Sequence, residues 1–495
     1  MKYISTRDKS VQLSAAEAIL LGLSRDGGLL LPDTFPTLSL EEIGQLAPLA
    51  YPQRAASIMS LFLEDFSKSE LLTYTQQAYG AEKFDEGNAA PVVQVGDDFF
   101  LELWHGPTSA FKDIALQMLP RFLSASLEKT DEKRDVCILV ATSGDTGKAA
   151  LEGFRDVDRT KIMVFYPRDG VSDIQKLQMM TQEGENVGVC SVVGNFDDAQ
   201  TGVKTIFSDE AFRAELDAGG FFLSSANSIN WGRLLPQIVY YFSAYCDLVN
   251  AEIVKPGEPI NFCVPTGNFG NILAGYFAMK MGLPINKLIC ASNSNDVLTD
   301  FIKTGTYDRR REFFTTTSPS MDILISSNLE RLLFDLSGND DKLIAGYMKS
   351  LNDEGEYTVS PEILARLQDI FECGAIDDKR TASKIAKMFR EKGYLFDTHT
   401  AVAYGVMEDY RARSGDKTTT VVLSTASPYK FTEAVLEALG ETAAGDGLAL
   451  IDALEAIEGQ AAPEPLKALR GKAVRFNDEI EKTEMLGVVK KLLGV

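Results

Sequence analysis

The fold of this chain is decided by the stretch Val136-Cys-Ile-Leu-Val-Ala-Thr-Ser-Gly-Asp-Thr-Gly147. Its first six residues are all apolar, which is typical of a strand that is buried on both faces. The next six are small or polar and predict a tight turn, since glycine allows a sharp change of direction. An amphipathic pattern from Lys148 to Val157 then predicts a helix.

The same order of strand, turn and helix returns along the chain. Apolar runs predict further strands at residues 162–166, 187–193, 260–264, 287–291 and 420–423. Parallel strands need a crossover connection, usually a helix, so this alternation predicts parallel sheets covered by helices. We therefore expect an α/β fold whose turns gather at the carboxyl edges of the sheets, where ligands bind.

The composition is that of an ordinary globular protein of about three domains' length. Of the 495 residues, 45% are hydrophobic and 24% are charged. Lysine and arginine number 49 against 71 aspartates and glutamates, which gives a net charge of −22. An acidic chain repels nucleic-acid phosphates, which argues against a nucleic-acid partner. A small phosphorylated ligand stays compatible, because it needs only a local pocket of N–H groups and one or two cations.

Cysteine and histidine usage narrows the class of protein further. The six cysteines, at 137, 190, 246, 263, 290 and 373, form no C-x-x-C pair, so neither a disulfide framework nor a structural zinc site is expected. The only two histidines, His105 and His399, exclude an H-E-x-x-H metal site. Charges in the first 24 residues argue against a signal peptide, and no run of 18 apolar residues occurs. We expect a cytoplasmic protein without a bound metal and without membrane contact.

The two ends of the chain lack the recurring unit. Residues 1–90 show helical patterns at 15–23, 40–49 and 57–78. Residues 443–495 are helix-rich, with a break at Pro463 and Pro465. No linker of low complexity separates these parts from the centre, so the boundaries between them are not marked by composition.

Two of the turns are candidate anion sites. Thr266-Gly-Asn-Phe-Gly-Asn271 lies between a predicted strand and a predicted helix, where converging N–H groups and the positive end of the helix dipole suit a phosphate monoester. The alternative is a tight turn that needs glycine for its positive φ and binds nothing. Thr142-Ser-Gly-Asp-Thr146 offers hydroxyl and N–H groups to a carboxylate or a phosphate, or serves only as a helix cap. Neither turn matches a Walker loop or a dinucleotide fingerprint.

Lys112 is the candidate for covalent chemistry. It lies in His105-Gly-Pro-Thr-Ser-Ala-Phe-Lys-Asp-Ile-Ala-Leu-Gln117, where a Gly-Pro turn gives way to a helical pattern with apolar neighbours. Withdrawal from water disfavours the ammonium form, lowers its pKa and frees the amine for Schiff-base formation. The alternative is a solvated surface lysine. His105 and His399 are expected to be structural.

Together these motifs resemble threonine synthase, a family of pyridoxal-phosphate enzymes with the tryptophan-synthase-β fold. The supporting stretches are 105–117, 141–147, 266–271, Gly194-Asn-Phe-Asp-Asp-Ala-Gln200, Asn227-Ser-Ile-Asn-Trp231 and Ser424-Thr-Ala-Ser-Pro428. The resemblance runs in order from the first residues to about Phe431 and is similar to the longer form of the enzyme. It implies a two-lobed parallel-sheet fold, with a mostly helical N-terminal domain over 1–90 and a catalytic core over 91–433. The mobile lobe would lie within 115–220, and a helical C-terminal part would cover 434–495.

The resemblance also implies the site residues. Lys112 would hold pyridoxal 5′-phosphate as a Schiff base, and its phosphate would be bound by Gly267, Asn268, Phe269, Gly270 and Asn271. Thr425 would place a hydroxyl at the pyridine nitrogen, and Asp145 would lie near the cofactor. The substrate would be bound by Thr142, Ser143, Gly144 and Thr146 at its carboxylate and by Ser228, Asn230, Arg233 and Lys176 at its phosphate. A charged Asp145 beside a carboxylate is unfavourable, so it would be protonated, paired with a cation or turned toward the cofactor.

The implied reaction converts O-phospho-L-homoserine and water into L-threonine and phosphate, by γ-elimination of phosphate and β-addition of water. The alternatives are a dehydratase-like lyase acting on serine or threonine, and a relative that only hydrolyses the phosphate ester. Two positions depart from the family pattern: Ser427 stands where a histidine is expected, and Thr398 where proline is common. The sequence predicts small-molecule partners and leaves the choice between monomer and dimer open.

Overall fold

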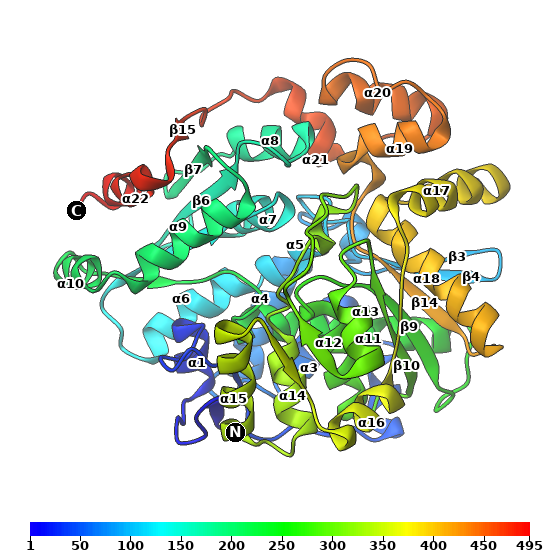
Figure 1. Cartoon of the computed structure of the whole chain (residues 1–495), viewed down its shortest axis with the longest axis horizontal. Coiled ribbons are helices and arrows are strands. Elements are labelled where there is room, and N and C mark those ends of the chain that lie inside the picture. The colour runs from blue at the N-terminus through cyan, green and yellow to red at the C-terminus, as the bar shows by residue number, and fades with distance from the viewer.

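Two parallel β-sheets form the centre of the molecule (Figure 1). The computed structural model describes residues 1–495 except for the side chains of Glu86 and Asp197. The smaller sheet has the strand order β15-β7-β6-β5-β8, and all of its strands run parallel. Its strands are β5 (Asp135–Ala141), β6 (Thr160–Pro167), β7 (Val187–Val192), β8 (Phe221–Ser224) and β15 (Glu479–Ile480). The predicted α/β architecture is confirmed.

The larger sheet has the strand order β13-β10-β9-β14-β4-β3 and is parallel except for the edge strand β3. Its strands are β3 (Val92–Val95), β4 (Asp98–Glu102), β9 (Ile260–Pro265), β10 (Ile285–Ser292), β13 (Phe371–Ala375) and β14 (Thr420–Ser424). Every residue of β9 and β14 is buried, as are all but the first residue of β5. Because helices cover both faces, these strands show unbroken apolar runs instead of the alternation of a half-exposed strand.

Helices surround both sheets. The smaller sheet is accompanied by α7 (Asp145–Phe154), α8 (Asp173–Met180), α9 (Phe196–Ser208) and α10 (Glu210–Ala218). The larger sheet is accompanied by α11 (Trp231–Asn250), α12 (Gly270–Lys280), α13 (Val297–Thr304), α16 (Pro361–Ile370) and α18 (Thr398–Ser414). The other elements of the core are α5 (Lys112–Leu116), α6 (Leu119–Lys129), α14 (Leu329–Leu336), α15 (Asp341–Asp353), α17 (Asp378–Lys392) and the antiparallel pair β11 (Thr306–Asp308) and β12 (Glu356–Thr358).

The N-terminal part is mostly helical, as predicted, and shares a core with the larger sheet. It contains α1 (Ala15–Leu21), α2 (Leu40–Leu46), α3 (Tyr51–Met59), α4 (Lys68–Tyr79) and the antiparallel strands β1 (Tyr3–Ser5) and β2 (Leu30–Pro32). The single helix predicted over 57–78 is wrong, because α3 ends at Met59 and Ser67 begins α4 with a capping box to Glu70. The apolar pattern of the sequence continues between the two helices because Phe62, which lies outside both, is also buried. Helix α3 packs on the long buried helix α11.

The C-terminal part crosses from the larger to the smaller sheet. It contains α19 (Thr432–Leu439), α20 (Gly447–Glu458), α21 (Glu464–Lys467) and α22 (Met485–Leu493). Between α21 and α22 the chain adds β15 beside β7, so this part is not purely helical as the sequence predicted (red in Figure 1). Met485 and Val489 of α22 then join the hydrophobic cluster of the smaller sheet.

Three further features concern the cysteines, membrane-spanning helices and metal ligands. All six cysteines are free and buried. Across the described residues, no helix combines the length and apolar character needed to cross a membrane. The described side chains also contain no group of three or more histidine, cysteine, aspartate or glutamate residues placed to hold a metal ion.

The close approach of α5 and α7 gives a test of packing. A Cβ atom added at Gly153, in the last turn of α7, would come within 2.0 Å of the main-chain oxygen of Leu116. Because the obstacle is backbone, Gly153→Ala should lower the free energy of unfolding by about 1–3 kcal/mol. Gly487→Ala on α22, where nothing lies within 4 Å, should leave stability unchanged or raise it by about 0.5–1 kcal/mol. Denaturant unfolding measures both, and equal stability of the two variants would contradict the packing.

Candidate active site

A cavity of about 300 Å³ is lined by turns that follow strands of both sheets. These turns follow β5, β9 and β14, so the carboxyl edges of the two sheets meet at one site, as parallel sheets favour. The predicted site residues that line it are Lys112, Thr142, Ser143, Thr146, Ser228, Arg233, Gly267, Asn268, Phe269, Gly270, Asn271 and Thr425. Four other predicted residues, Gly144, Asp145, Asn230 and Lys176, lie outside this lining.

Lys112 is the first residue of α5 and is only 9% exposed. Its Nζ donates a hydrogen bond to Ser320 Oγ at 3.0 Å and lies 3.6 Å from Asp145 Oδ2. Burial lowers the pKa of this amine to about 8; Asp145 opposes the shift, and Arg233 and Lys430 add to it. The alternative of a solvated surface lysine is therefore wrong, and the free amine is well populated in mildly alkaline solution.

Asp145 is paired with cations, which answers the question that the sequence left open. The fully buried Lys430 places its Nζ 2.6 Å from Asp145 Oδ1 and donates to the main-chain oxygen of Thr108 at 2.9 Å. Gln175 Nε2 donates to the same aspartate oxygen at 2.8 Å. Burial raises the pKa of Asp145, but Lys430 and then Lys112 more than offset it and hold the pKa well below its ordinary value. The carboxylate is therefore charged.

The turn between β9 and α12 is shaped for close contact with a ligand. Phe269 has a φ of 62°, in the left-handed region, and this conformation leads the chain into α12. A Cβ atom at Gly267 would lie 2.5 Å from the main-chain oxygen of Ser320, so this position requires glycine. The first N–H groups of a helix have no hydrogen-bond partner within the helix. The first residues of α12, Gly270 and Asn271, line this cavity.

Asn271 adds an amide group to the same turn. Its Oδ1 accepts hydrogen bonds from the hydroxyls of Tyr240 at 2.5 Å and Tyr241 at 3.0 Å. The buried Nδ2 of the same amide has no acceptor among the described residues. A buried amide donor without a partner points to a ligand acceptor in the cavity.

The turn after β5 combines both roles that the sequence left open. Thr142 Oγ1 accepts hydrogen bonds from the N–H groups of Gly144 at 3.0 Å and Gly147 at 2.9 Å, and so acts as a cap. Its hydroxyl proton, together with the side chains of Ser143 and Thr146, remains available on the cavity wall. Gly144 itself lies behind the wall with a φ of 138°, against the side chain of Gln175.

Thr425 is held beside the Lys112 segment by main-chain hydrogen bonds. The N–H of Phe111 donates to the Thr425 oxygen at 2.9 Å, and the N–H of Ser427 donates to the Ser109 oxygen at 3.1 Å. Ser427, which departs from the family pattern, is fully buried and lies outside the cavity lining. This short ladder places the Thr425 hydroxyl and the Lys112 amine on one cavity.

Three residues in contact with this site, His399, Ser320 and Lys430, were not assigned to it from the sequence. His399 accepts a hydrogen bond at Nε2 from the Ser320 N–H (3.1 Å), and its Nδ1 lies 2.6 Å from Asp397 Oδ2. His399 lines the cavity and holds the loop that carries Ser320, the partner of Lys112; its purely structural role stays a prediction. Both Ser320 and Lys430 belong to short 3₁₀ turns; Ser320 lies in no motif, and Lys430 lies two residues beyond the 424–428 stretch.

Arg233 is a buried cation without a counter-ion. It lies in the first turn of α11, is 4% exposed, and donates from Nη1 to the main-chain oxygen of Ala226 at 2.6 Å. Among the described residues its Nε has no acceptor and no carboxylate lies within 4 Å. Burial lowers its pKa to about 10. An arginine in this position is suited to bind an anion from the cavity.

The neighbouring Asn230 has a different role. Its side chain caps α11, accepting from the Gly232 N–H at 2.9 Å and donating to the main-chain oxygens of Ile19 at 3.0 Å and Ser225 at 3.3 Å. Lys176 lies on α8, outside the lining. By contrast Gln200 and Lys204 of α9 do line the cavity. Their helix begins within the 194–200 stretch, which the sequence analysis gave only as a mark of resemblance.

Three family models match the chain over almost its whole length. They are described as "Threonine synthase N terminus", over residues 2–79, "Pyridoxal-phosphate dependent enzyme", over 92–426, and "Threonine synthase, C-terminal", over 400–487. The chain is 41% identical over 440 residues to the threonine synthase of Pseudomonas aeruginosa, with 88% of this chain and 90% of that protein covered. The chain belongs to the threonine synthase family.

Other members of the threonine synthase family support the same assignment. The structure matches the crystal structure of pyridoxal-phosphate-bound threonine synthase from Brucella melitensis with a TM-score of 0.87 and 38% identity, covering 100% of this chain and 98% of that one. Human threonine synthase-like 1 is 42% identical over 457 residues, covering 88% of this chain, but the match spans only 60% of that longer protein. The resemblance and the fold predicted from the sequence are confirmed. The domain limits near residues 90 and 433 and the mobile lobe within 115–220 stay predictions.

The cavity fits pyridoxal phosphate, the cofactor of this enzyme family. A buried lysine amine with a lowered pKa suits the aldehyde carbon, and the unpaired Asn271 amide at the α12 N-terminus suits the phosphate. The Thr425 hydroxyl lines the same cavity and offers a neutral hydrogen bond to a ring nitrogen.

The lowered pKa of Lys112 gives a pH-dependent prediction. In cofactor-free protein, the rate of Lys112 acylation should rise with pH and level off above a midpoint near 8, because only the unprotonated amine reacts. A solvated lysine reaches half-deprotonation only near pH ~10.4. Mass spectrometry of the peptides that carry Lys112 and the exposed Lys68 measures the two rates side by side. If the acylation rates of Lys112 and Lys68 rose in parallel above about pH 9, the lowered pKa assigned to Lys112 would be wrong.

Proposed function

We propose that the protein converts O-phospho-L-homoserine and water into L-threonine and inorganic phosphate. The observation that carries the proposal is one buried amine, on Lys112, sharing a cavity with two separate unpaired donor groups. These donors are the Asn271 amide and the Arg233 guanidinium. A cofactor phosphate and a substrate phosphate need two phosphate sites in one cavity, whereas a dehydratase acting on serine needs only the site for the cofactor phosphate.

Lys112 and the β9–α12 turn serve the cofactor in this proposal. Pyridoxal phosphate, when bound, supplies an electron sink that stabilises the negative charge left at carbon after a proton is removed. The turn over 267–271 would bind its phosphate, Thr425 would face its pyridine nitrogen, and Lys112 would hold it. The released Lys112 amine would then move protons at the substrate's α and β carbons. A pKa near 8 suits this work, because the amine and ammonium forms are both populated near neutral pH.

The substrate would be oriented by its two anionic ends. Arg233 and Ser228 are proposed to bind the phosphate, because the buried guanidinium has no carboxylate partner among the described residues. Thr142, Ser143 and Thr146 are proposed to bind the carboxylate through hydroxyl and N–H donors. The sequence-based assignment of Asn230 and Lys176 to the phosphate finds no support in the cavity lining.

Asp145 is proposed to act on Lys112 and not on the substrate carboxylate. Lys430 neutralises its charge at one oxygen, to which Gln175 also donates a hydrogen bond, while the other oxygen faces Lys112 at 3.6 Å. The pair therefore orients the amine and keeps burial from lowering its pKa further. Its predicted contact with the cofactor stays a prediction.

We also infer that the protein works in the cytoplasm on small molecules. Six buried, free cysteines support a reducing compartment, and the net charge of −22 disfavours nucleic acid.

Product analysis tests the proposed reaction. With pyridoxal phosphate and O-phospho-L-homoserine, the purified protein should release L-threonine and phosphate in equal amounts. Proton and phosphorus NMR measure the two products. Lys112→Ala should abolish both turnover and the visible absorbance of the bound cofactor, because the amine is lost. Homoserine with phosphate would instead indicate ester hydrolysis. Consumption of serine or threonine without any use of the phosphorylated substrate would indicate a dehydratase.

Arg233 gives a second test of the reaction. Arg233→Gln should lower kcat/KM for O-phospho-L-homoserine by about 100-fold, because a buried charge-assisted contact to the substrate phosphate is lost. The cofactor absorbance should remain, since the Asn271 turn is unchanged. Arg213→Gln, at an exposed position on α10, is the matched control and should behave as the parent protein. An unchanged kcat/KM in Arg233→Gln would remove this residue from the substrate site.

A further inference from the structure

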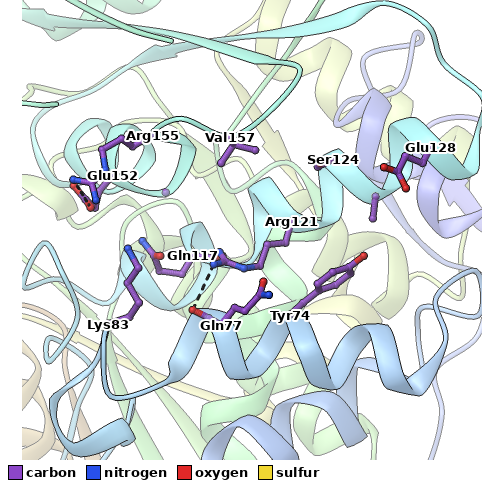
Figure 2. A pocket seen from close by; sticks show the side chains of 12 residues that line it. Tyr74, Gln77, Lys83, Gln117, Arg121, Ser124, Glu128, Glu152, Arg155 and Val157 are labelled. Carbon is purple, nitrogen blue, oxygen red and sulfur yellow. Dashed lines mark hydrogen bonds and ion pairs between the residues drawn. The ribbon is translucent and has the colours of Figure 1, made fainter. Parts of the chain in front are cut away.

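A second cavity, of about 310 Å³, lies away from the active site (Figure 2). Its wall is formed by α4 and the residues after it, by the end of α5, by α6 and by the end of α7. Gln77 and Glu128, which are exposed, belong to its rim. Helices of the N-terminal part and of the catalytic core therefore meet around this cavity.

Two cations of this wall have no counter-ion. Lys83 and Arg121 both line the cavity, and no carboxylate lies within 4 Å of either among the described residues. The Arg121 guanidinium bonds only to main-chain oxygens, those of Gln117 at 2.5 Å and Gln77 at 3.4 Å. Its Nε is buried and has no acceptor among the described residues. Both cations are thus free to bind an anion.

Gln117 provides an independent sign of a ligand. It is 2% exposed and lines the cavity beside Arg121, yet its Nε2 has no hydrogen-bond acceptor among the described residues (Figure 2). A buried amide donor that stays unpaired costs free energy, so an acceptor is expected in the hollow. Three donors, on Gln117, Arg121 and Lys83, therefore surround the same space.

Two carboxylates also line this cavity, Glu128 at the exposed rim and Glu152 on the wall. Glu152 is held by Lys148 at 3.4 Å and by Arg155 at 3.5 Å, and it also accepts from Gln182 Nε2 at 3.3 Å. Although burial raises the pKa of Glu152, Lys148, Arg155 and then Lys83 outweigh it, so the carboxylate is charged. Among the described residues, Glu152 forms its ion pairs with Lys148 and Arg155, and neither Glu152 nor Glu128 lies within 4 Å of Lys83 or Arg121.

We propose that this cavity binds a small organic anion, whose carboxylate or phosphate group contacts Lys83, Arg121 and Gln117. The site differs from the active site in position and in residues. Gln117 follows the last residue of α5, whereas Lys112 begins it. Glu152 and Gly153 lie in the last turns of α7, whereas Asp145 begins that helix. The anion would therefore bind at the far ends of the two helices that carry the Lys112–Asp145 pair.

Hydrogen exchange of the holoenzyme tests the proposal without using its activity. Malonate and inorganic phosphate are added separately, at matched ionic strength and up to about 20 mM. At least one of them should slow amide exchange about threefold or more in the peptides covering 117–128 and 150–157. Phosphate that enters the active site instead would protect residues 266–271, so the two sites are told apart by position.

Variants of Lys83 complete the test. Lys83 is half-buried and forms no ion pair among the described residues, so Lys83→Glu should fold normally and weaken anion binding about tenfold or more. Lys68→Gln, an exposed position on α4, is the control and should bind as the parent does. Protection by malonate alone identifies a carboxylate ligand, and protection by phosphate alone identifies a phosphate ester. Absence of protection with both anions, or equal protection in Lys83→Glu, would overturn the proposal and leave the cavity to water.

Discussion

The buried ion pair between Asp145 and Lys430 is the interaction on which the active site depends. Asp145 begins α7, which belongs to the smaller sheet, and Lys430 lies in the turn that follows β14 of the larger sheet. Neither charge is accessible to water, and loss of Asp145 would leave Lys430 without a carboxylate partner among the described residues, at a cost of about 3–5 kcal/mol. The pair therefore holds together elements from both sheets at the cavity where their turns meet.

The balance of charge around that pair determines the chemistry. Three cations, Lys112, Arg233 and Lys430, act on one another across the site, and Asp145 compensates only part of their charge. Burial and the other two cations lower the pKa of Lys112, while Asp145 keeps it from falling further. The remaining positive charge is what a cavity needs if it is to accept two phosphates.

The second cavity follows the same physical logic at a different place. Among the described residues, Lys83 and Arg121 are cations without counter-ions, and Gln117 has an amide nitrogen without an acceptor. In each cavity, the unpaired donors lie on short segments at helix ends, where main-chain groups are also incompletely bonded. Unsatisfied polar groups of this kind are rare in folded proteins, which makes them informative about ligands.

The sequence alone determined the elements whose signal is local. The apolar runs of β5, β9 and β14, the glycine turns after them and the apolar surroundings of Lys112 were all readable, because burial on both faces and positive φ leave a mark within a few residues. Only the tertiary structure decided the partner of Asp145, the contact of Ser320 with Lys112 and the orientation of Asn271 by Tyr240. These contacts join residues from 31 to 285 positions apart, where no periodicity in the chain records which side chains will meet.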